Sequence, residues 1–476
     1  MKKIILSLFC SSLMLATSCV DSLDDYNLSQ KEAAAVPSET LFTNAVKGLT
    51  DALTSASVNS NNYRFYVQHW TATTYLDEPR YNMTSRTIPQ AMWQSLYRDV
   101  LSDLKESKRL AMENTATIES VKNNQLAQIE IMEVYAWSVL LNTFGDVPYS
   151  EALDPENSLP VYDDAQTTYN AILGRLNNAL TLINPTAEGY EDGDLLYEGD
   201  MEKWVKFGNS LKLKLAMVIA DADAAQARTL VEAAAPNVFT SNADNTVFRY
   251  LGAQPNNNPV SNSVTGPYST REDYVAANTL VDVMNDLKDP RRGQFFTQVG
   301  GEYKGGIYGF TNSYPDFSTV SAKVAAPDNP GLLLDYSEVK FLLAEALERG
   351  FAVGGTAQEH YNEAIKASIT YWGGTDAEAT AYLAQPSVAY ATAAGDWKEK
   401  IGTQKWIALY NRGYDAWVEW RRLDAPTLLP PVEGLVVPLR MIYPVNEATL
   451  NGANKAAASS AIGGDSSDTA LWWDVE

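Results

Sequence analysis

The sequence has 476 residues and a formal net charge of −23, and 45% of its residues are hydrophobic. This length allows a large buried core in one or two domains. Because so acidic a surface repels phosphate groups, the charge excludes nucleic acid as a partner.

The first residues have the pattern of a secretory signal. Lys2 and Lys3 precede an apolar run over 4–15, and the small residues 16–18 lead to Cys19. We therefore expect residues 1–18 to be a signal peptide and Cys19 to be the lipidated first residue of the mature chain. Ordinary cleavage after residue 18, without lipid, is the alternative that the small residues also allow.

An acidic segment follows the cysteine. Asp21, Asp24 and Asp25 lie close together, and we expect 19–35 to be a lipidated acidic tether. The cluster is similar to the acidic signal that sends some bacterial lipoproteins to the cell surface, and a solvated tether is the plainer interpretation. No later segment has the run of about 18 apolar residues that a membrane-spanning helix needs, so any membrane attachment is expected at Cys19.

The body of the chain is predicted to be all-α, or mainly α. Helical periodicity is clear near 90–112, 118–144, 164–183 and 200–221. Capping-box sequences, in which a cap oxygen and an acid or amide three residues later satisfy orphan N–H groups, occur at 163–166, 335–338, 356–359, 375–378 and 396–399. Helices joined by short breaks, such as Gly354-Gly355, predict a tetratricopeptide-like scaffold of helical hairpins, although no clean 34-residue repeat is present.

Two segments do not follow the helical pattern. Residues 58–88 are rich in Asn, Tyr and Thr, and residues 240–330 are rich in Asn, Gly, Pro, Tyr and Ser. The second is too long for an ordinary connection, which indicates a functional or separately folded insert. Its glycines follow no predicted strand, so a flexible surface loop is favoured over a phosphate-binding loop.

Catalytic motifs are almost missing from the sequence. His69 and His360 are the only histidines, and without a cysteine in the body a Cys/His zinc site is excluded. Asp77-Glu78 is the most suggestive acid pair for a glycoside hydrolase. Adjacent residues rarely point into one cleft, so a polar binding or structural role is favoured for this pair.

One acidic run could hold calcium. It extends from Glu191 through Asp192 and Asp194 to Asp200, but it lacks the spacing of an EF-hand. A solvated acidic loop is favoured, and we predict no metal or cofactor.

Aromatic residues are the most distinctive part of the composition, with 26 Tyr and 11 Trp. Flat rings with a polar edge suit the binding of sugars or extended peptides, although core packing explains most aromatic residues on helices. Those in the two irregular segments are the candidates for ligand binding, together with two polar neighbours that could donate hydrogen bonds. The predicted site residues are Trp70, Tyr75, Arg80, Tyr81, Asn82, Tyr268, Tyr308 and Tyr314.

Four segments resemble the SusD/RagB family of surface nutrient-binding lipoproteins. In chain order they are LNTFGDVPY at 141–149, YSEV with LAEA over 336–346, KWIALY with GYDAW and WRR over 405–422, and RMIYP at 440–444 followed by Glu447 and Asn451. These motifs also have physical explanations. Asp146 can turn the chain before Pro148, and Arg421 and Arg422 can pair with buried acids near a helix C-terminus.

The resemblance implies a single SusD-like domain over 36–476, with loop inserts near 58–88 and 240–330. It implies a non-enzymatic protein that captures oligosaccharides for a SusC-like TonB-dependent transporter in the outer membrane. Oligopeptide binding is the alternative within the same family. A surface glycoside hydrolase and a structural or adhesive surface protein are the alternatives from other classes.

Overall fold

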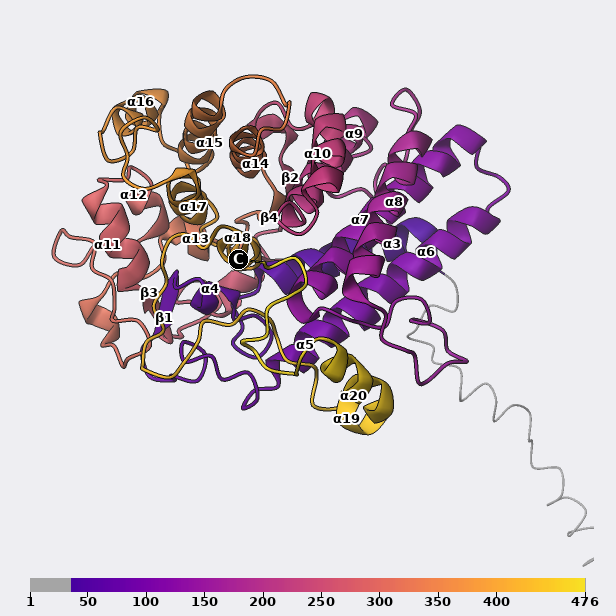
Figure 1. Ribbon diagram of the computed structural model, residues 1–476, viewed down its shortest axis with the longest axis horizontal. Helices are drawn as coiled ribbons and strands as arrows, with labels where there is room; N and C mark the ends of the chain where they lie inside the picture. Colours follow the sequence, from indigo (N-terminus) through magenta and orange to yellow (C-terminus); the bar gives the residue numbers. More distant parts are fainter. Residues whose placement is uncertain (1–35, 476) are drawn as a thin grey trace, which may run out of the picture. The chain divides into compact units, whose positions relative to one another are not determined.

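The computed structural model describes residues 36–475, so the predicted signal peptide, Cys19 and the whole acidic tether over 19–35 lie outside the described residues. From Ser38 onward the chain packs as one compact unit. This unit is mainly helical and contains four short strands among residues 36–475, which confirms the predicted fold class (Figure 1). None of the helices in this part of the chain is long and apolar enough to cross a membrane.

The longer helices lie close to the predicted ranges. The periodic segment near 90–112 is a continuous helical stretch made of α5 (Ile88–Gln94), the π-helical turn η1 (Ser95–Leu101) and α6 (Ser102–Glu113). The other long helices are α3 (Ser38–Thr54), α7 (Glu119–Phe144), α8 (Ala165–Leu182), α9 (Met201–Val218), α10 (Ala224–Ala234), α14 (Tyr336–Glu348), α15 (Ala357–Tyr371), α16 (Asp376–Leu383), α17 (Trp397–Ala408), α18 (Gly413–Leu423) and α20 (Gly452–Ala461).

The predicted capping boxes are complete at three of the five helix starts. Complete capping boxes form at Thr356, Thr375 and Asp396, each with the glutamate three residues later. In these boxes both the cap side chain and the glutamate satisfy backbone N–H groups, which fixes where the helix begins.

The other two predicted capping boxes are not complete. Helix α8 is capped by Asp164 rather than Asp163, whose carboxylate instead accepts the N–H groups of Tyr149 and Ser150. Asp335 caps α14, but Glu338 does not reach back to it, because its carboxylate pairs with buried basic side chains.

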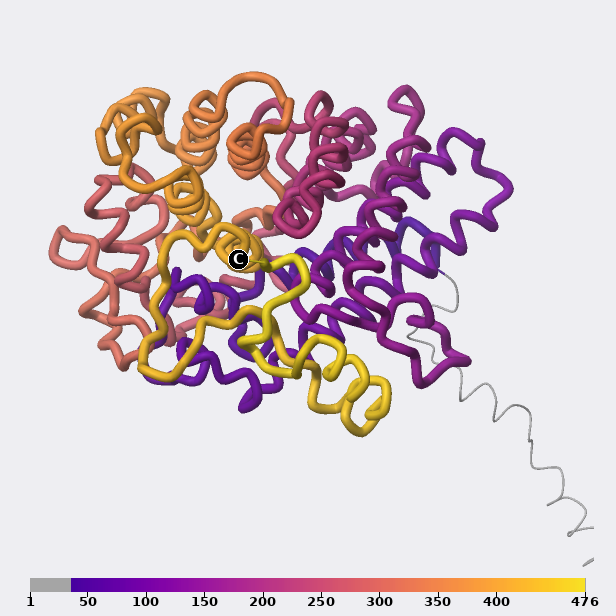
Figure 2. The backbone as a smooth tube through the Cα atoms, viewed as in Figure 1, coloured from indigo at the N-terminus to yellow at the C-terminus, as the bar shows by residue number. Residues whose placement is uncertain are grey.

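The scaffold is built of helices that pack in pairs along the chain. Helices α7 and α8 lie against each other, as do α9 and α10, and α14 and α15 (Figure 1). Asn124 at the start of α7 donates to three backbone carbonyls after α8, which closes the first of these pairs. The C-terminal end returns to α18, where the Arg421 guanidinium lies 4.8 Å from the Trp473 ring (Figure 2).

The two irregular segments contain short elements instead of long helices. The first holds α4 (Tyr63–Tyr66) and β1 (Trp70–Ala72). The second holds β2 (Thr246–Phe248), β3 (Tyr274–Ala276), α12 (Arg292–Phe295) and α13 (Ala322–Ala325), together with α11 (Asn278–Asp286). The nine-residue helix α11 is the clearest departure from the loop prediction, and it forms because its apolar face is buried.

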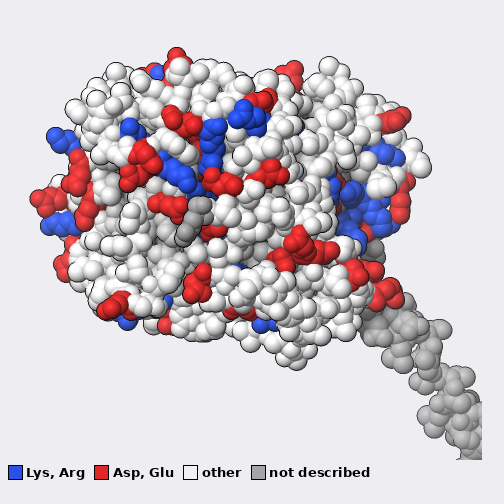
Figure 3. All heavy atoms as spheres, viewed as in Figure 1, with Lys and Arg blue, Asp and Glu red and all other residues white. Residues whose placement is uncertain are grey.

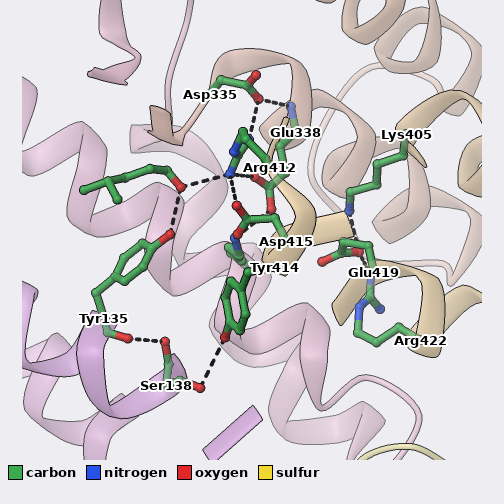
Figure 4. Close-up of polar contacts among 12 residues, drawn as sticks. Tyr135, Ser138, Asp335, Glu338, Lys405, Arg412, Tyr414, Asp415, Glu419 and Arg422 are labelled. Atoms are coloured by element: carbon green, nitrogen blue, oxygen red, sulfur yellow. Dashed lines mark hydrogen bonds and ion pairs between the residues drawn. The ribbon is translucent and has the colours of Figure 1, made fainter. Parts of the chain in front are cut away.

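A network of ion pairs joins four helices inside the scaffold (Figure 4). Arg412 Nη2 lies 2.6 Å from Glu338 and 2.9 Å from Asp415, and Lys214 pairs with both of these acids. Glu419 lies 2.6 Å from Lys405. The network connects α9, α14, α17 and α18, so the motif residues over 405–422 belong to the core of the fold.

The two arginines of the WRR motif have different partners. Arg422 pairs with Glu345 and Glu419, as expected for a buried base. Arg421 donates instead to the carbonyls of Leu439 and Asn142 and lies over the Trp417 ring at 3.6 Å. Burial lowers the pKa of Arg421 to about 10, which still leaves it charged at neutral pH.

Charged side chains of both signs are interspersed over the face of the molecule seen in Figure 3, and large areas carry neither sign. Several apolar side chains are exposed in loops. Leu429 is 72% exposed, and Ile307 and Phe310 are exposed in the second irregular segment. The surface is therefore mixed, with polar and apolar regions side by side.

Candidate ligand-binding site

The two irregular segments meet through a short antiparallel sheet. Strand β1 pairs with β3, with Trp70 opposite Ala276 and Ala72 opposite Tyr274 (Figure 1). Just beyond the strands, the Thr73 N–H donates to the carbonyl of Asp273 at 2.9 Å, which continues the pairing. Segments that lie about two hundred residues apart in sequence are thus held in a fixed register.

A third strip of chain completes this region. Asn312 donates from its side chain to the carbonyl of Ala72 at 3.0 Å, and its N–H donates to the carbonyl of Thr73 at 2.9 Å. The 307–314 loop therefore lies along the end of β1. All three strips come from the two segments in which the sequence predicted ligand contacts.

A cavity of about 190 Å³ opens where the strands end. Val58, Ala72 and Tyr274 form its apolar part. Tyr75 also lines it and is 58% exposed, so much of its ring is available to a ligand. A space of this size beside an exposed ring can receive part of an extended molecule that lies along the surface.

Two ion pairs line the same cavity. Arg86 pairs with the buried carboxylate of Glu78, and Arg271 Nε lies 2.6 Å from Asp273 Oδ2. The Arg86 guanidinium also lies 5.5 Å from the centre of the Tyr75 ring, which holds that ring in place. The lining therefore offers both hydrogen-bond donors and acceptors to hydroxyl or amide groups.

Two further predicted tyrosines lie on or against the loop that carries Arg271: Tyr268 belongs to it, and Tyr314 contacts it from the 307–314 loop. Tyr314 donates its hydroxyl to Thr265 Oγ1 at 3.0 Å, and Thr265 donates to the carbonyl of Arg271 at 2.6 Å. Tyr268 is 36% exposed and donates to the carbonyl of Gly252 at 2.7 Å. The structure thus brings Tyr75, Tyr268 and Tyr314 to one region of the surface.

Three of the predicted ring residues are core residues instead. Trp70, Tyr81 and Tyr308 are 1%, 8% and 6% exposed. Trp70 donates its indole N–H to the Tyr410 hydroxyl at 3.2 Å, and Tyr308 donates to the carbonyl of Phe65 at 2.6 Å. Since their faces pack against other side chains, these rings cannot stack on a ligand in this conformation.

The two predicted polar residues hold loops in place. Arg80 donates to the carbonyl of Gly309 at 3.0 Å and lies 5.6 Å from the Phe310 ring, which ties the first segment to the second. Asn82 is exposed, but its carbonyl oxygen accepts the N–H groups of Thr84 and Ser85. Both side chains are therefore engaged in shaping the rim of the region.

Asp77 and Glu78 do not face each other across a cleft. Glu78 is 1% exposed and paired with Arg86, whereas Asp77 is exposed and accepts a hydrogen bond from Ser85 Oγ at 3.0 Å. A retaining or inverting hydrolase needs two carboxyls on opposite sides of one bond. The contacts of this pair agree with the polar binding or structural role that the sequence favoured, and Glu78 lines the candidate cavity.

A family model described as starch-binding and associating with the outer membrane matches residues 29–444, which is most of the chain. The chain belongs to this SusD-like family. Membership confirms the family that the four motifs indicated, and it places the chain among carbohydrate-binding, outer-membrane-associated proteins.

Solved structures of SusD-like proteins have the same fold. A chitin-binding protein has 29% sequence identity and a TM-score of 0.79, over 92% of this chain and 100% of that one. A SusD homologue from Bacteroides uniformis has 27% identity and a TM-score of 0.76, over 92% of this chain and 99% of that one. A chitin-binding SusD homologue from Flavobacterium johnsoniae has 24% identity and a TM-score of 0.78, over 92% and 99% of the two chains. No curated protein matches the sequence.

Several lining residues of this SusD-like chain were not among the predicted site residues. Arg86, Arg271 and Asp273 are charged, and Val58 and Tyr274 are apolar. The three charged residues could have been predicted from the sequence, because ionisable side chains in irregular segments such as 58–88 and 240–330 often contact ligands. The strand pairing that brings them together has no local signal in the sequence.

The acidic run after α8 does not present its carboxylates together. Asp194 is 1% exposed, and its oxygens accept the Trp204 indole N–H at 2.7 Å and the N–H groups of Leu196 and Gly199. Within residues 36–475, no group of three or more His, Cys, Asp or Glu side chains could hold a metal ion. His69 is buried, and burial lowers its pKa to about 3, so it is neutral at physiological pH.

Proposed function

We propose that this SusD-like protein is a cell-surface lipoprotein that captures oligosaccharides for a SusC-like TonB-dependent transporter. The observation that carries the proposal is the junction of β1 and β3, which sets the exposed ring of Tyr75 beside a cavity lined by two ion pairs. Sugar rings stack their C–H faces on such rings while their hydroxyls bond to charged neighbours.

A chitin-type oligosaccharide is the first ligand to test. The relative with 29% identity is described as chitin-binding, whereas the family description names starch. Isothermal titration calorimetry of the mature protein with a chitin hexamer and a maltose hexamer separates these two classes. A panel of short peptides covers the oligopeptide alternative, since paired charges can also bind peptide backbones and termini.

The Tyr75→Ala variant tests the proposed site directly. Tyr75 is 58% exposed, so a ligand stacked on it buries the remaining ring, and its loss should cost about 1–2 kcal/mol. That is roughly a five- to thirty-fold weaker affinity. Tyr303→Ala is the matched control, because this half-buried tyrosine is outside the cavity lining. Unchanged affinity in Tyr75→Ala, with folding intact, would move the binding site elsewhere.

Lipid anchoring and the absence of catalysis are parts of the same proposal. Mass spectrometry of the native N-terminus should give an acylated Cys19, and Cys19→Ala should release the protein from membranes, because acyl chains provide the anchoring energy. The hexamers should be recovered uncut after incubation. Release of shorter products by the pure protein, lost in Glu78→Gln, would instead support a hydrolase.

A further inference from the structure

The size of the cavity beside Tyr75 indicates which part of a ligand it holds. Its volume of about 190 Å³ is below the roughly 300–1,000 Å³ of pockets that enclose a whole small molecule. A sugar ring that stacks on the exposed Tyr75 side chain therefore stays outside the cavity, and a substituent of that ring enters it. The chemistry of the lining then determines which substituent fits.

One part of the cavity wall is apolar and buried. Val58, Ala72 and Tyr274 form it, and they are 9%, 3% and 7% exposed. The Tyr274 hydroxyl donates to the Ala56 carbonyl at 3.2 Å, so the polar atom of this side chain already has a partner. An apolar group that packs against these side chains is removed from water, which favours binding. This part of the wall fits a group of about the size of a methyl.

The other part of the wall consists of the two ion pairs, and each arginine makes its pair through Nε. Arg86 Nε donates to Glu78 Oε1, and Arg271 Nε donates to Asp273 Oδ2 at 2.6 Å. Within residues 36–475 the Nη atoms of both arginines donate no hydrogen bond, and Glu78 Oε2 and Asp273 Oδ1 accept none. Each ion pair therefore offers a donor beside an acceptor.

The charges in the lining balance, because two guanidinium groups lie with two carboxylates. A carboxylate or sulfate substituent would pair with the arginines but would be repelled by Glu78 and Asp273, and an ammonium would be repelled by the arginines. A hydroxyl would bond to the ion pairs but would leave the apolar part without a contact. A neutral group with a donor, an acceptor and a methyl satisfies both parts of the wall.

We propose that this cavity takes the acetamido group of a 2-acetamido sugar and that Val58 and Ala72 set this specificity. The inference rests on the proposed function and assigns the substituent that the same site recognises. The methyl packs against Val58 and Ala72, the amide N–H donates to a carboxylate, and the amide carbonyl accepts from an arginine Nη. The sugar ring that carries the group stacks on Tyr75.

The first test compares three hexamers that differ only at the second carbon of each sugar. The chitin hexamer, its fully deacetylated form and cellohexaose share the β-1,4 linkage, and they carry an acetamido, an ammonium and a hydroxyl group at that carbon. They are titrated by calorimetry into the mature protein at pH 6. We expect the chitin hexamer to bind more tightly than each of the others by about tenfold or more.

An altered ligand and a matching variant locate the methyl. A hexamer with propionyl in place of acetyl carries a longer acyl chain, and the wild type should bind it more weakly than the chitin hexamer. Val58→Ala makes room in the apolar part of the wall, so it should reverse this order. Val436→Ala is the matched control, because Val436 is 52% exposed and lies outside the cavity lining.

Ala72→Val makes the opposite change. It adds bulk to the same part of the wall, and a β-branched residue suits the strand β1 that carries it. We expect the affinity for the chitin hexamer to fall by about tenfold, while the affinity for cellohexaose stays unchanged because that ligand has no acyl group. Unchanged binding of cellohexaose also shows that the variant is folded. If Val58→Ala fails to fold, Ala72→Val and the three hexamers still decide the outcome.

Four results would overturn the inference. Equal affinity for the chitin hexamer and cellohexaose would do so and would leave the proposed function standing. Tighter binding of the deacetylated hexamer would contradict the neutral substituent, and an unchanged order of the acetyl and propionyl hexamers in Val58→Ala would contradict the role of Val58. Tighter binding of hexaalanine, which offers amides and methyl groups without a sugar ring, would assign the site to peptides. Failure to bind any of the hexamers would instead reject the proposed function, and this inference with it.

Discussion

Replacing Glu419 with glutamine tests how much the buried ion-pair network contributes to stability. Glu419 is 3% exposed, and its Oε2 accepts Lys405 Nζ at 2.6 Å and Arg422 Nη2 at 2.7 Å. Lys405 is fully buried, and the ion pair with Glu419 supplies its countercharge (Figure 4). Arg422 keeps Glu345 as a second partner.

The variant leaves the Lys405 ammonium buried with no negative charge in contact. Removing one partner of a buried pair typically costs about 3–5 kcal/mol, and we expect Glu419→Gln to lose that much at pH 7. The glutamine keeps an acceptor oxygen and nearly the same volume. The loss of unfolding free energy in this variant therefore measures the missing negative charge and not an empty space in the core.

The pH dependence of the loss follows from the pKa of Glu419. Burial alone would raise this pKa, but Arg422 and Lys405 together lower it to about 2. Because the pKa of the folded state is below that of the unfolded chain, the contribution to stability is complete above about pH 4.5 and is lost as pH falls through about 2. Lowering the pKa of Glu419 from 4.5 to about 2 corresponds to about 3 kcal/mol of stability contributed by the ionised carboxylate.

Urea unfolding followed by tryptophan fluorescence measures the effect, since the chain has 11 Trp. The difference in unfolding free energy between wild type and Glu419→Gln should be largest at pH 7 and should shrink towards pH 3. Glu106→Gln is the matched control, because Glu106 forms an exposed pair with Arg109 that is worth at most about 1 kcal/mol. A loss below 1 kcal/mol at pH 7, or one that does not change with pH, would refute the reasoning.

Two further predictions separate packing from binding near the proposed site. Trp70→Ala should lower the free energy of unfolding by about 3–5 kcal/mol, because it empties a buried ring position, whereas Tyr75→Ala should leave the melting temperature nearly unchanged. Arg271→Gln should weaken oligosaccharide binding several-fold in calorimetry without a loss of stability, because its exposed pair with Asp273 contributes little to folding.

The helical scaffold was predictable because its signals are local. A threonine and a glutamate three residues apart are enough to set the starts of α15 and α16. The start of α8 was placed one residue early because Asp163 and Asp164 are chemically equivalent. Asp163 accepts a hydrogen bond from the Tyr149 N–H, so its carboxylate is not available to cap the helix. This long-range contact decides that Asp164 is the cap.

The candidate site was predictable only in part. The sequence located it in two segments, and exposed tyrosines from both are present there. It could not tell Trp70 from Tyr75, since both are aromatic residues in the same loop-like stretch. Their difference depends on the pairing of β1 with β3, which buries Trp70 against Tyr274 at 5.6 Å and leaves Tyr75 beyond the strand. Long-range pairing of this kind leaves no trace in a local pattern.

One glycine connects the buried network to the position of the site. Gly413 begins α18, between Arg412 and Asp415 of the network, and it packs directly against α4. A Cβ atom at Gly413 would lie 2.6 Å from Arg64 N and 2.9 Å from the Tyr63 carbonyl carbon, both of which are backbone atoms. Since α4 leads into β1 within four residues, any shift of α4 is passed to β1 and to the cavity beyond it.

We therefore expect Gly413→Ala to act on stability and on ligand binding together. Overpacking of this kind costs about 1–3 kcal/mol, and the displaced strand should weaken oligosaccharide binding although Gly413 is outside the cavity lining. Gly174→Ala is the matched control: a Cβ there meets no atom within 4 Å, and alanine in a helix interior should stabilise by about 1 kcal/mol. Thermal melts and calorimetry of both variants measure the two effects. Wild-type affinity in a destabilised Gly413→Ala would show that the contact between α18 and α4 supports the fold without positioning the site.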